Sequence, residues 1–386
     1  MRAAALLTAA LLLLLSGCGD GGVRDVTVAR EIEDLELIRA MGVDRTEDGV
    51  RVTLASAREI ASGGEEKSGG GNEAVVLSQS AGTVSQAVAR MQSFGSKGVF
   101  YGHIGSYLVG ETLARDGIRD YLDYVERNPE MRLETDLYVI RAGTANGAIA
   151  AMTGEGYDIN ERLEFLQENA DLSADTHPVT VRMFLIRTER YGSTICPALR
   201  LTEHREGDGA RGDSALLPDG FAVLTDGRLR GYLDGEAAYG ASLLMNETSE
   251  DTVTVTAPGG VRVALTLSDC RTRVRPEFDR DGTLTALRVT TRLRAGVDEV
   301  EGRLDLESMA VTEALCRSLE TLERSRMEEA LALAKSWNAD CFGLGARAAL
   351  AAPFRWREEA WSPAAVPVIV EVEAQVERSY DSFQSA

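Results

Sequence analysis

The sequence predicts an α+β fold: a mixed α/β protein of several subdomains, with antiparallel hairpins and a long C-terminal helix packed on a sheet. Three Asp-Gly pairs stand between apolar runs, at residues 48–49, 226–227 and 281–282, which is the pattern of tight hairpin turns. Apolar residues recur at helical spacing over residues 304–337, which indicates one long helix. The chain has 386 residues, 44% hydrophobic and 26% charged, and this composition is typical of a globular protein.

The first 17 residues are typical of a secretory signal peptide. Arg2 begins a short basic segment, and residues 3–15 form an apolar run shorter than the roughly 20 residues of a membrane-spanning helix. Gly17 directly precedes Cys18, and this ending resembles the lipobox of bacterial lipoproteins. The resemblance implies a diacylglyceryl group on Cys18, cleavage after Gly17 and a lipidated tether over residues 18–29. The alternative is an ordinary signal peptide with an incidental cysteine.

Residues 30–202 are predicted to form an N-terminal α/β domain. It begins with the hairpin at residues 48–49, and Thr83 and Gln86 have the spacing of a capping box at the start of a helix. The pattern over residues 179–190 fits both a strand and a helix. The other predicted elements are a buried strand over residues 100–109, a helix over 113–125, a strand over 135–140, a short alanine-rich helix and a helix over 159–168.

A charged, glycine-rich stretch over residues 203–214 is predicted to be a linker, followed by a C-terminal α+β domain over residues 215–380. The long helix over residues 304–337 precedes the last strand of this domain, so we expect it to pack on the sheet. The predicted strands cover residues 221–224, 229–233, 252–256, 261–267, 274–278, 284–293 and 366–372.

The formal net charge is −20, from 61 acidic and 41 basic residues. A surface this acidic disfavours nucleic acid as a partner and gives no electrostatic attraction to anionic lipid headgroups. We therefore expect that the lipid on Cys18, and not a basic patch, holds the protein at a membrane.

Sequence motifs of common catalytic and cofactor sites are absent. His103, His177 and His204 are far apart without HExxH spacing, and neither GxSxG nor GxxxxGK[ST] occurs. We therefore expect no enzymatic activity, no metal and no cofactor, and a function that depends on binding. His103 lies in the apolar stretch over residues 100–109, where we expect a partly buried structural histidine.

Four cysteines remain besides Cys18. They are far apart in the sequence and form no CxxC pair, which favours buried free thiols over two disulfides. These cysteines are Cys196, Cys270, Cys316 and Cys341.

Four stretches between residues 30 and 372 resemble, in order, the Ger(x)C lipoproteins of spore nutrient-germinant receptors. The first is Arg30-Glu31-Ile32-Glu33-Asp34-Leu35 with Gly42-Val43-Asp44 and Asp48-Gly49. The second is Phe100-Tyr101-Gly102-His103 with Gly110-Glu111, the stretch 113–118, Arg127 and Arg132. The third is the hairpin over residues 220–233, and the fourth is Asn338-Ala339-Asp340 with Phe342-Gly343-Leu344-Gly345, Pro353, Trp356 and Trp361.

The resemblance implies a protein of about three subdomains, anchored by lipid at the outer face of the cell membrane or of the spore inner membrane. It implies two integral-membrane germinant-receptor subunits as partners, and a role in germination signalling without catalysis. The sequence alone says nothing about spores.

The resemblance also singles out polar residues in the N-terminal domain as candidates for an interface. The structural alternative, which we favour, is that they form turn caps and buried polar pairs that fix this domain. The candidates are Arg30, Glu31, His103, Glu111, Arg127 and Arg132.

Two other functions are alternatives to the receptor subunit. One is a lipid-tethered solute-binding protein of the cell envelope, which usually has alternating βα units and a parallel sheet. The three Asp-Gly hairpins argue against it. The other is an envelope hydrolase with a carboxylate pair, and no residue pattern supports it.

Overall fold

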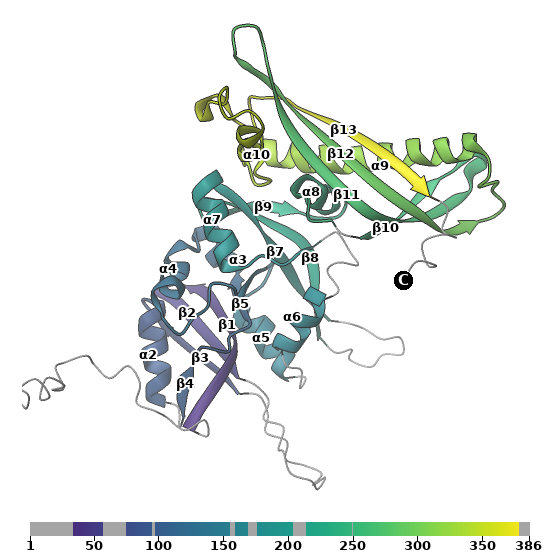
Figure 1. The fold of residues 1–386 in the computed structure, drawn as a ribbon. Helices are drawn as coiled ribbons and strands as arrows, with labels where there is room; N and C mark the ends of the chain where they lie inside the picture. The colour runs from purple at the N-terminus through teal and green to yellow at the C-terminus, as the bar shows by residue number, and fades with distance from the viewer. Residues whose placement is uncertain are drawn as a thin grey trace, which may run out of the picture.

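The computed structural model describes residues 34–56, 75–94, 97–154, 159–168, 176–203, 214–248 and 250–377. These residues form two β-sheets: a nine-stranded sheet from the first part of the chain and a four-stranded sheet from the last part (Figure 1). Helices pack on both faces of the larger sheet, and a long helix lies along the smaller one. The predicted α+β fold class is confirmed.

The larger sheet begins with the first predicted hairpin. β1 (Leu35–Thr46) and β2 (Gly49–Ser56) pair antiparallel around the turn at residues 47–48, and β3 (Val76–Ala81) pairs with β2. α2 (Val84–Phe94) follows. The amide of Gln86 donates a hydrogen bond to Oγ1 of Thr83 at 3.2 Å, as the capping pattern predicts.

The centre of the larger sheet is parallel. β5 (Ser106–Gly110) pairs with β1, β6 (Asp136–Ile140) pairs with β5, and β7 (Ser193–Glu203) pairs with β6. The short β4 (Gly98–Phe100) pairs with the start of β1. The three Asp-Gly hairpins predicted antiparallel pairing, but the four central strands β1, β5, β6 and β7 pair in parallel.

The helices between these strands divide between the two faces of the sheet. α2 packs with α3 (Glu111–Asp116), α4 (Arg119–Arg127) and α7 (Val181–Tyr191) on one face. α5 (Ala145–Gly154) and α6 (Ile159–Glu168) pack on the other.

Beyond β7 the sheet continues with antiparallel strands. β8 (Ser214–Thr225) pairs with β7, and β9 (Arg228–Leu233) pairs with β8. Asp226 and Gly227 in the turn have φ angles of 50° and 74°, the left-handed conformation of a two-residue hairpin loop. The segment predicted as a linker, residues 203–214, thus joins two paired strands, and the larger sheet extends to Leu233.

The smaller sheet has the strand order β10 (Asp251–Thr256), β11 (Arg262–Phe278), β12 (Leu284–Glu301), β13 (Val368–Glu377). The first three strands are antiparallel, and β13 joins β12 in parallel. α9 (Met309–Ser336) lies along one face, as predicted. The other elements here are α8 (Glu236–Met245), α10 (Leu344–Ala351) and the 3-10 helices Pro258–Gly260 and Glu358–Ala360.

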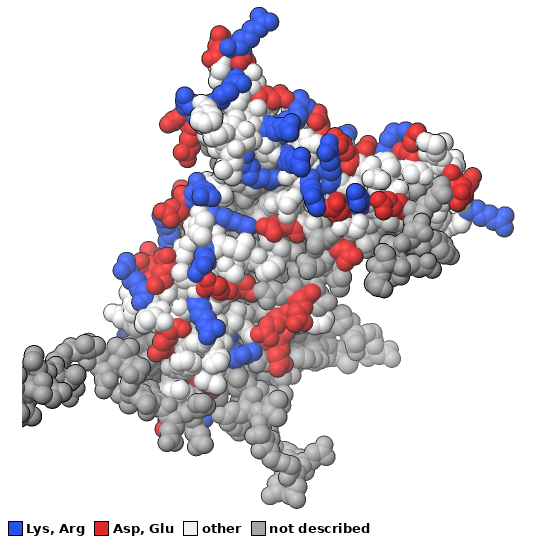
Figure 2. Space-filling view, in the orientation of Figure 1, with Lys and Arg blue, Asp and Glu red and all other residues white. Residues whose placement is uncertain are grey.

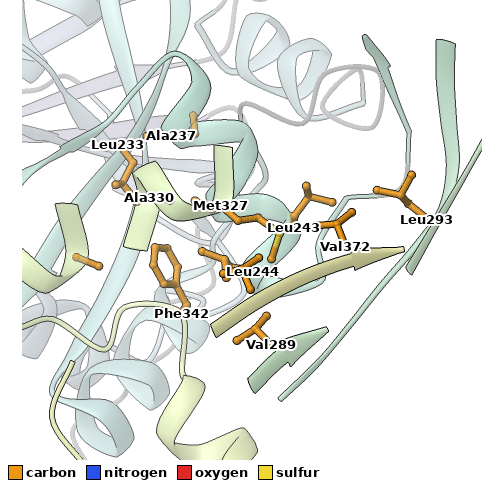
Figure 3. Close-up of a cluster of buried hydrophobic side chains, with 14 of the residues drawn as sticks. Leu233, Ala237, Leu243, Leu244, Val289, Leu293, Met327, Ala330, Phe342 and Val372 are labelled. Carbon is orange, nitrogen blue, oxygen red and sulfur yellow. The ribbon is translucent and has the colours of Figure 1, made fainter. Parts of the chain in front are cut away.

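Strand β8 takes part in two hydrophobic cores, because its side chains alternate between the faces of the sheet. Ala222 and Leu224 belong to the core of α2, α3, α4 and α7. Phe221 and Val223 belong to a second core, with α8, α9 and the smaller sheet. Figure 3 shows this second core, where Leu233 of β9 lies among side chains of α8 and α9.

Two predicted elements are interrupted in the structure. The strand over residues 100–109 is divided into β4 and β5, because the chain turns at Gly102 and His103. The helix over residues 113–125 is divided into α3 and α4, because Gly117 has a φ of 125°, outside the helical range.

Other elements differ from the sequence patterns in extent or type. The ambiguous stretch over residues 179–190 is the helix α7, which begins after Thr180, whose side chain accepts a hydrogen bond from the amide of Met183 at 3.2 Å. The strands predicted over residues 261–267 and 274–278 are one continuous strand, β11. No predicted element corresponds to α8 or α10.

Candidate functional site

The carboxyl ends of the parallel strands β1 and β5 lie next to each other, and Asp44 stands near this edge. Its two carboxylate oxygens accept hydrogen bonds from the amides of Ala145 and Asn146 at 2.7 and 2.8 Å, and so cap the start of α5. Burial raises the pKa of Asp44, while these two hydrogen bonds act in the opposite direction. A side chain at Gly110 would collide with this carboxylate. Packing within the domain therefore explains the spacing of Asp44 and Gly110 in the sequence.

Glu111, next to this edge, fastens α3 to distant parts of the sheet. Its Oε2 accepts hydrogen bonds from the amide of Ala142 at 2.6 Å and the hydroxyl of Tyr232 at 2.9 Å, and its Oε1 pairs with Arg115 at 2.6 Å. Burial alone would raise the pKa of Glu111, but these three partners together lower it. The guanidinium of Arg141 lies 4.4 Å from the centre of the Tyr232 ring.

Asp340 has the same capping role in the C-terminal part. Its carboxylate accepts hydrogen bonds from the amides of Leu344 and Gly345, both at 2.8 Å, at the start of α10. The indole of Trp361 donates a third hydrogen bond, also at 2.8 Å. Asp44, Glu111 and Asp340 thus hold backbone and side-chain donors in place, which is a structural use of a carboxylate.

A groove of about 1580 Å³ runs between α2 and α4 and reaches the β8–β9 hairpin. We call it the α2–α4 groove. Val84 and Val88 of α2, Tyr121 and Tyr124 of α4, Leu185 of α7 and Arg228 of β9 contribute to its lining. The floor of the α2–α4 groove is apolar, and its sides carry charged residues.

Tyrosine side chains contribute to the floor of this groove. Tyr121 is 2% exposed, and its hydroxyl has no hydrogen-bond partner among the described residues. Burial raises the pKa of Tyr121 well above its usual value. The ring of Tyr107 lies edge-on to it, with the ring centres 6.2 Å apart. An unpaired hydroxyl at this depth is costly, so the packing of the Tyr121 ring in the core must outweigh that cost.

The sides of the groove are mainly acidic. Arg127 pairs with Asp123 at 2.8 Å, and Arg45 pairs with Asp116 at 3.2 Å. Four further acidic residues and two further arginines line the groove without an ion pair to a described residue; they are Asp120, Glu126, Glu130, Glu189, Arg119 and Arg228. Figure 2 shows acidic and basic side chains next to each other over α4.

The solvent face of the smaller sheet is, by contrast, rich in arginine. Arg288 pairs with Glu277 and with Glu371 of β13, and Arg292 pairs with Glu373 at 2.6 Å. Carboxylates of the same sheet neutralise most of these arginines. The number of arginines therefore overstates how strongly this face would attract an acidic partner.

The predicted site residues lie in different places. Cys18, Arg30 and Glu31 are outside the described residues. Glu111 is in the framework described above, in agreement with a structural role. Arg127 is exposed at the side of the α2–α4 groove.

His103 and Arg132 correct the expectation of buried polar residues. His103 is exposed, because it stands in the turn between β4 and β5, and its ring lies 5.7 Å from the ring of Phe100. Arg132 is also exposed. Neither of them forms a buried polar pair.

The sequence alone does not indicate a site at Tyr121 and the acidic residues of α4. Tyr121 follows the apolar spacing of α4, so the pattern predicts it only as a core residue. The one available signal was the recurrence of Asp120, Asp123 and Glu126 at every third position, which places three carboxylates along one side of the helix.

The four cysteines of the described chain are free thiols, as expected. Cys196 and Cys341 are buried, and burial raises the pKa of both. Cys270 and Cys316 are only partly buried. In the part of the chain that the structure describes, no group of three His, Cys, Asp or Glu side chains is placed to bind a metal. No helix there is long and apolar enough to cross a membrane.

Comparison with protein families gives two matches that together cover most of the chain. The "Spore germination protein N-terminal domain" matches residues 29–201, and "Spore germination B3/ GerAC like, C-terminal" matches residues 219–380.

Relatives of known sequence and structure point the same way. The chain is 26% identical over 258 residues to the Bacillus subtilis (strain 168) protein YfkR, in an alignment that covers 64% of this chain and 62% of YfkR. It is 24% identical over 261 residues to "Spore germination protein KC" of the same strain, covering 61% of this chain and 60% of that protein. The alignments thus span about three fifths of both relatives. The crystal structure of the GerBC protein is similar with a TM-score of 0.54 and 14% identity, over 87% of this chain and 96% of GerBC, which shows a shared fold.

Proposed function

The chain belongs to the Ger(x)C family of spore germination proteins, and from this membership we propose that it is the lipid-anchored C subunit of a nutrient-germinant receptor. In this role it acts without catalysis, at the outer face of the cell membrane or the spore inner membrane. Its partners are two integral-membrane subunits of the same receptor.

The observation that carries the proposal is that both family domains occur in order in one chain. The non-catalytic role is supported by the use of the carboxylates that the sequence singles out. Asp44, Glu111 and Asp340 accept hydrogen bonds from backbone amides of their own chain. A carboxylate held in this way is poorly available for proton transfer to a substrate.

The anchor is the part of the proposal that a single substitution tests. In a spore-forming strain whose only copy carries Cys18→Ala, we expect the protein to leave the membrane fraction and nutrient-triggered germination to fail. The physical reason is that the tether keeps the subunit near its partners at a high effective concentration. Cys316→Ala, which removes a partly buried free thiol, is the matched control and should change neither property. Normal germination of the Cys18→Ala strain would contradict the anchoring.

The partners are tested by purifying the tagged wild-type protein from detergent-solubilised spore membranes, with mass spectrometry of the protein and of what accompanies it. Two polytopic membrane proteins and a diacylglyceryl group on Cys18 are the expected result. A lipidated protein that is recovered alone would favour the lipid-tethered solute-binding protein instead.

A further inference from the structure

We propose that the α2–α4 groove is the docking site for a basic segment of a partner protein that carries apolar side chains on its inner side. The inference rests on the proposed function, because it names the surface through which the receptor subunit meets a partner. Three properties of the groove support it: its size, its charge and its floor.

The volume of the groove favours a polypeptide over a small molecule. Pockets for small ligands usually enclose about 300–1000 Å³. The α2–α4 groove offers about 1580 Å³ and is open along α4. Helices and extended segments bind in grooves of this kind, with apolar side chains pointing inwards.

The charge of the groove selects a basic partner. Asp120, Asp123 and Glu126 follow one side of α4, and only Asp123 of these three has an arginine partner in the described chain. Over the whole lining, four acidic residues but only two arginines are without an ion pair to a described residue. Phosphate-rich nucleic acid and anionic lipid are repelled by such a surface, whereas lysine and arginine side chains are attracted.

The floor supplies apolar contact. Val84, Val88 and Leu185 offer apolar surface. The ring of Tyr121 lies beneath this surface, closed off from solvent, and fixes the shape of the floor.

A pair of charge reversals tests the docking. Asp120→Lys with Glu126→Lys changes two exposed side chains of α4 and should leave the fold intact. We expect the amount of membrane subunit that copurifies with the tagged protein to fall about tenfold, because the surface then repels a basic segment. Glu358→Lys with Glu359→Lys, also exposed, makes the same change of charge on the 3-10 helix Glu358–Ala360 and should have no effect.

A cross-link identifies the segment itself. A photoreactive amino acid in place of Glu130, at the side of the groove, should form a cross-link to a lysine- and arginine-rich segment of the copurified subunit. The same photoreactive residue in place of Glu359 should not label that segment. A cross-link from position 130 to an acidic or neutral segment would overturn the inference.

The charge-reversal variant also separates the docking site from the proposed function. Unchanged copurification in the variant with Asp120→Lys and Glu126→Lys would refute the docking site and leave the receptor-subunit proposal standing. Absence of any copurified membrane protein with the wild type would refute the proposed function and, with it, this inference.

Discussion

The hydroxyl of Tyr232 in β9 donates a hydrogen bond to Oε2 of Glu111 in α3 over 2.9 Å, although 121 positions separate the two residues. The same carboxylate holds the amide of Ala142. Glu111 therefore ties the first part of the larger sheet to the antiparallel strands that continue it.

Replacement of Glu111 by alanine should destabilise the protein by about 2 kcal/mol, because the amide of Ala142 then loses its acceptor and Tyr232 its partner. Tyr232→Phe alone should cost about 1 kcal/mol. A double-mutant cycle, measured by urea unfolding, tests the coupling. The losses in free energy of unfolding of the two single variants should add up to more than the loss of the double variant. Glu126→Gln, an exposed residue of α4, is the control. Strict additivity of the two substitutions would contradict the coupling.

Gly345→Ala should destabilise the C-terminal part by about 1–3 kcal/mol, because the added Cβ would lie 2.5 Å from Cδ1 of Trp361 and 2.9 Å from Oδ2 of Asp340. The shift of Trp361 should also change the tryptophan fluorescence of the folded protein. Gly296→Ala in β12 adds its Cβ into open space and should be close to neutral. Equal stability of the two variants would show that the packing around Trp361 tolerates the methyl group.

Glu323 of α9 should make the protein less stable as the pH rises. Its side chain is buried beside Arg326 at 2.9 Å, and Asp251 and Glu236 share the same guanidinium. Burial is the main cause that raises the pKa of Glu323 to about 7, against the opposing effect of Arg326. The pKa of this group is 4.5 in the unfolded chain. Between pH 4.5 and about pH 7, the unfolded chain releases a proton that the folded chain keeps, so the free energy of unfolding falls as the pH rises.

The free energy of unfolding should therefore decrease by about 3 kcal/mol from this group between those two pH values, and remain level above them. Glu323→Gln should remove this part of the pH dependence while leaving the rest. Parallel stability profiles of the variant and the wild type would contradict the assignment.

His177 should act in the opposite direction, at lower pH. Burial, with a smaller contribution from Arg187, lowers the pKa of His177 to about 3. The pKa of this histidine is 6.5 in the unfolded chain, so below pH 6.5 the unfolded chain binds a proton that the folded chain does not. The stabilisation present above pH 6.5 is therefore lost as the pH falls towards 3. His177→Phe keeps an aromatic ring against Phe221 and should reduce the stability lost between pH 6.5 and pH 4 by about 3 kcal/mol. Thermal melting from pH 7 to pH 4 measures the difference, and an unchanged acid profile would be evidence against it.

Local features of the fold were predictable from the sequence because their causes are local. The turn at Asp226 and Gly227 depends on two residues that tolerate positive φ, and the start of α2 depends on Thr83. Gly117, by contrast, ends α3 within a pattern that is otherwise helical throughout. α8 was missed because nearly all its residues are apolar or small and most are buried, so it has no amphipathic pattern.

Most of the candidate site could not be predicted because its contacts join distant parts of the chain. Asp44 caps a helix that begins 101 positions later, and no feature around Asp44 indicates this partner. The exposure of His103 depends on the turn that separates β4 from β5. The α2–α4 groove combines α2, α4, α7 and the β8–β9 hairpin, so it exists only once these elements are packed.

The alternation of β8 has a mechanical consequence. Because Ala222 and Leu224 face one core while Phe221 and Val223 face the other, the strand is a common wall of both. Close-packed interiors are hardly compressible and transmit displacement. A substitution that changes the packing of Ala222 or Leu224 on one side of β8 should therefore also strain the contacts of α8 and α9 on the other. The two parts of the chain that the family domains match therefore share one wall of packed side chains, and neither core can be repacked without the other.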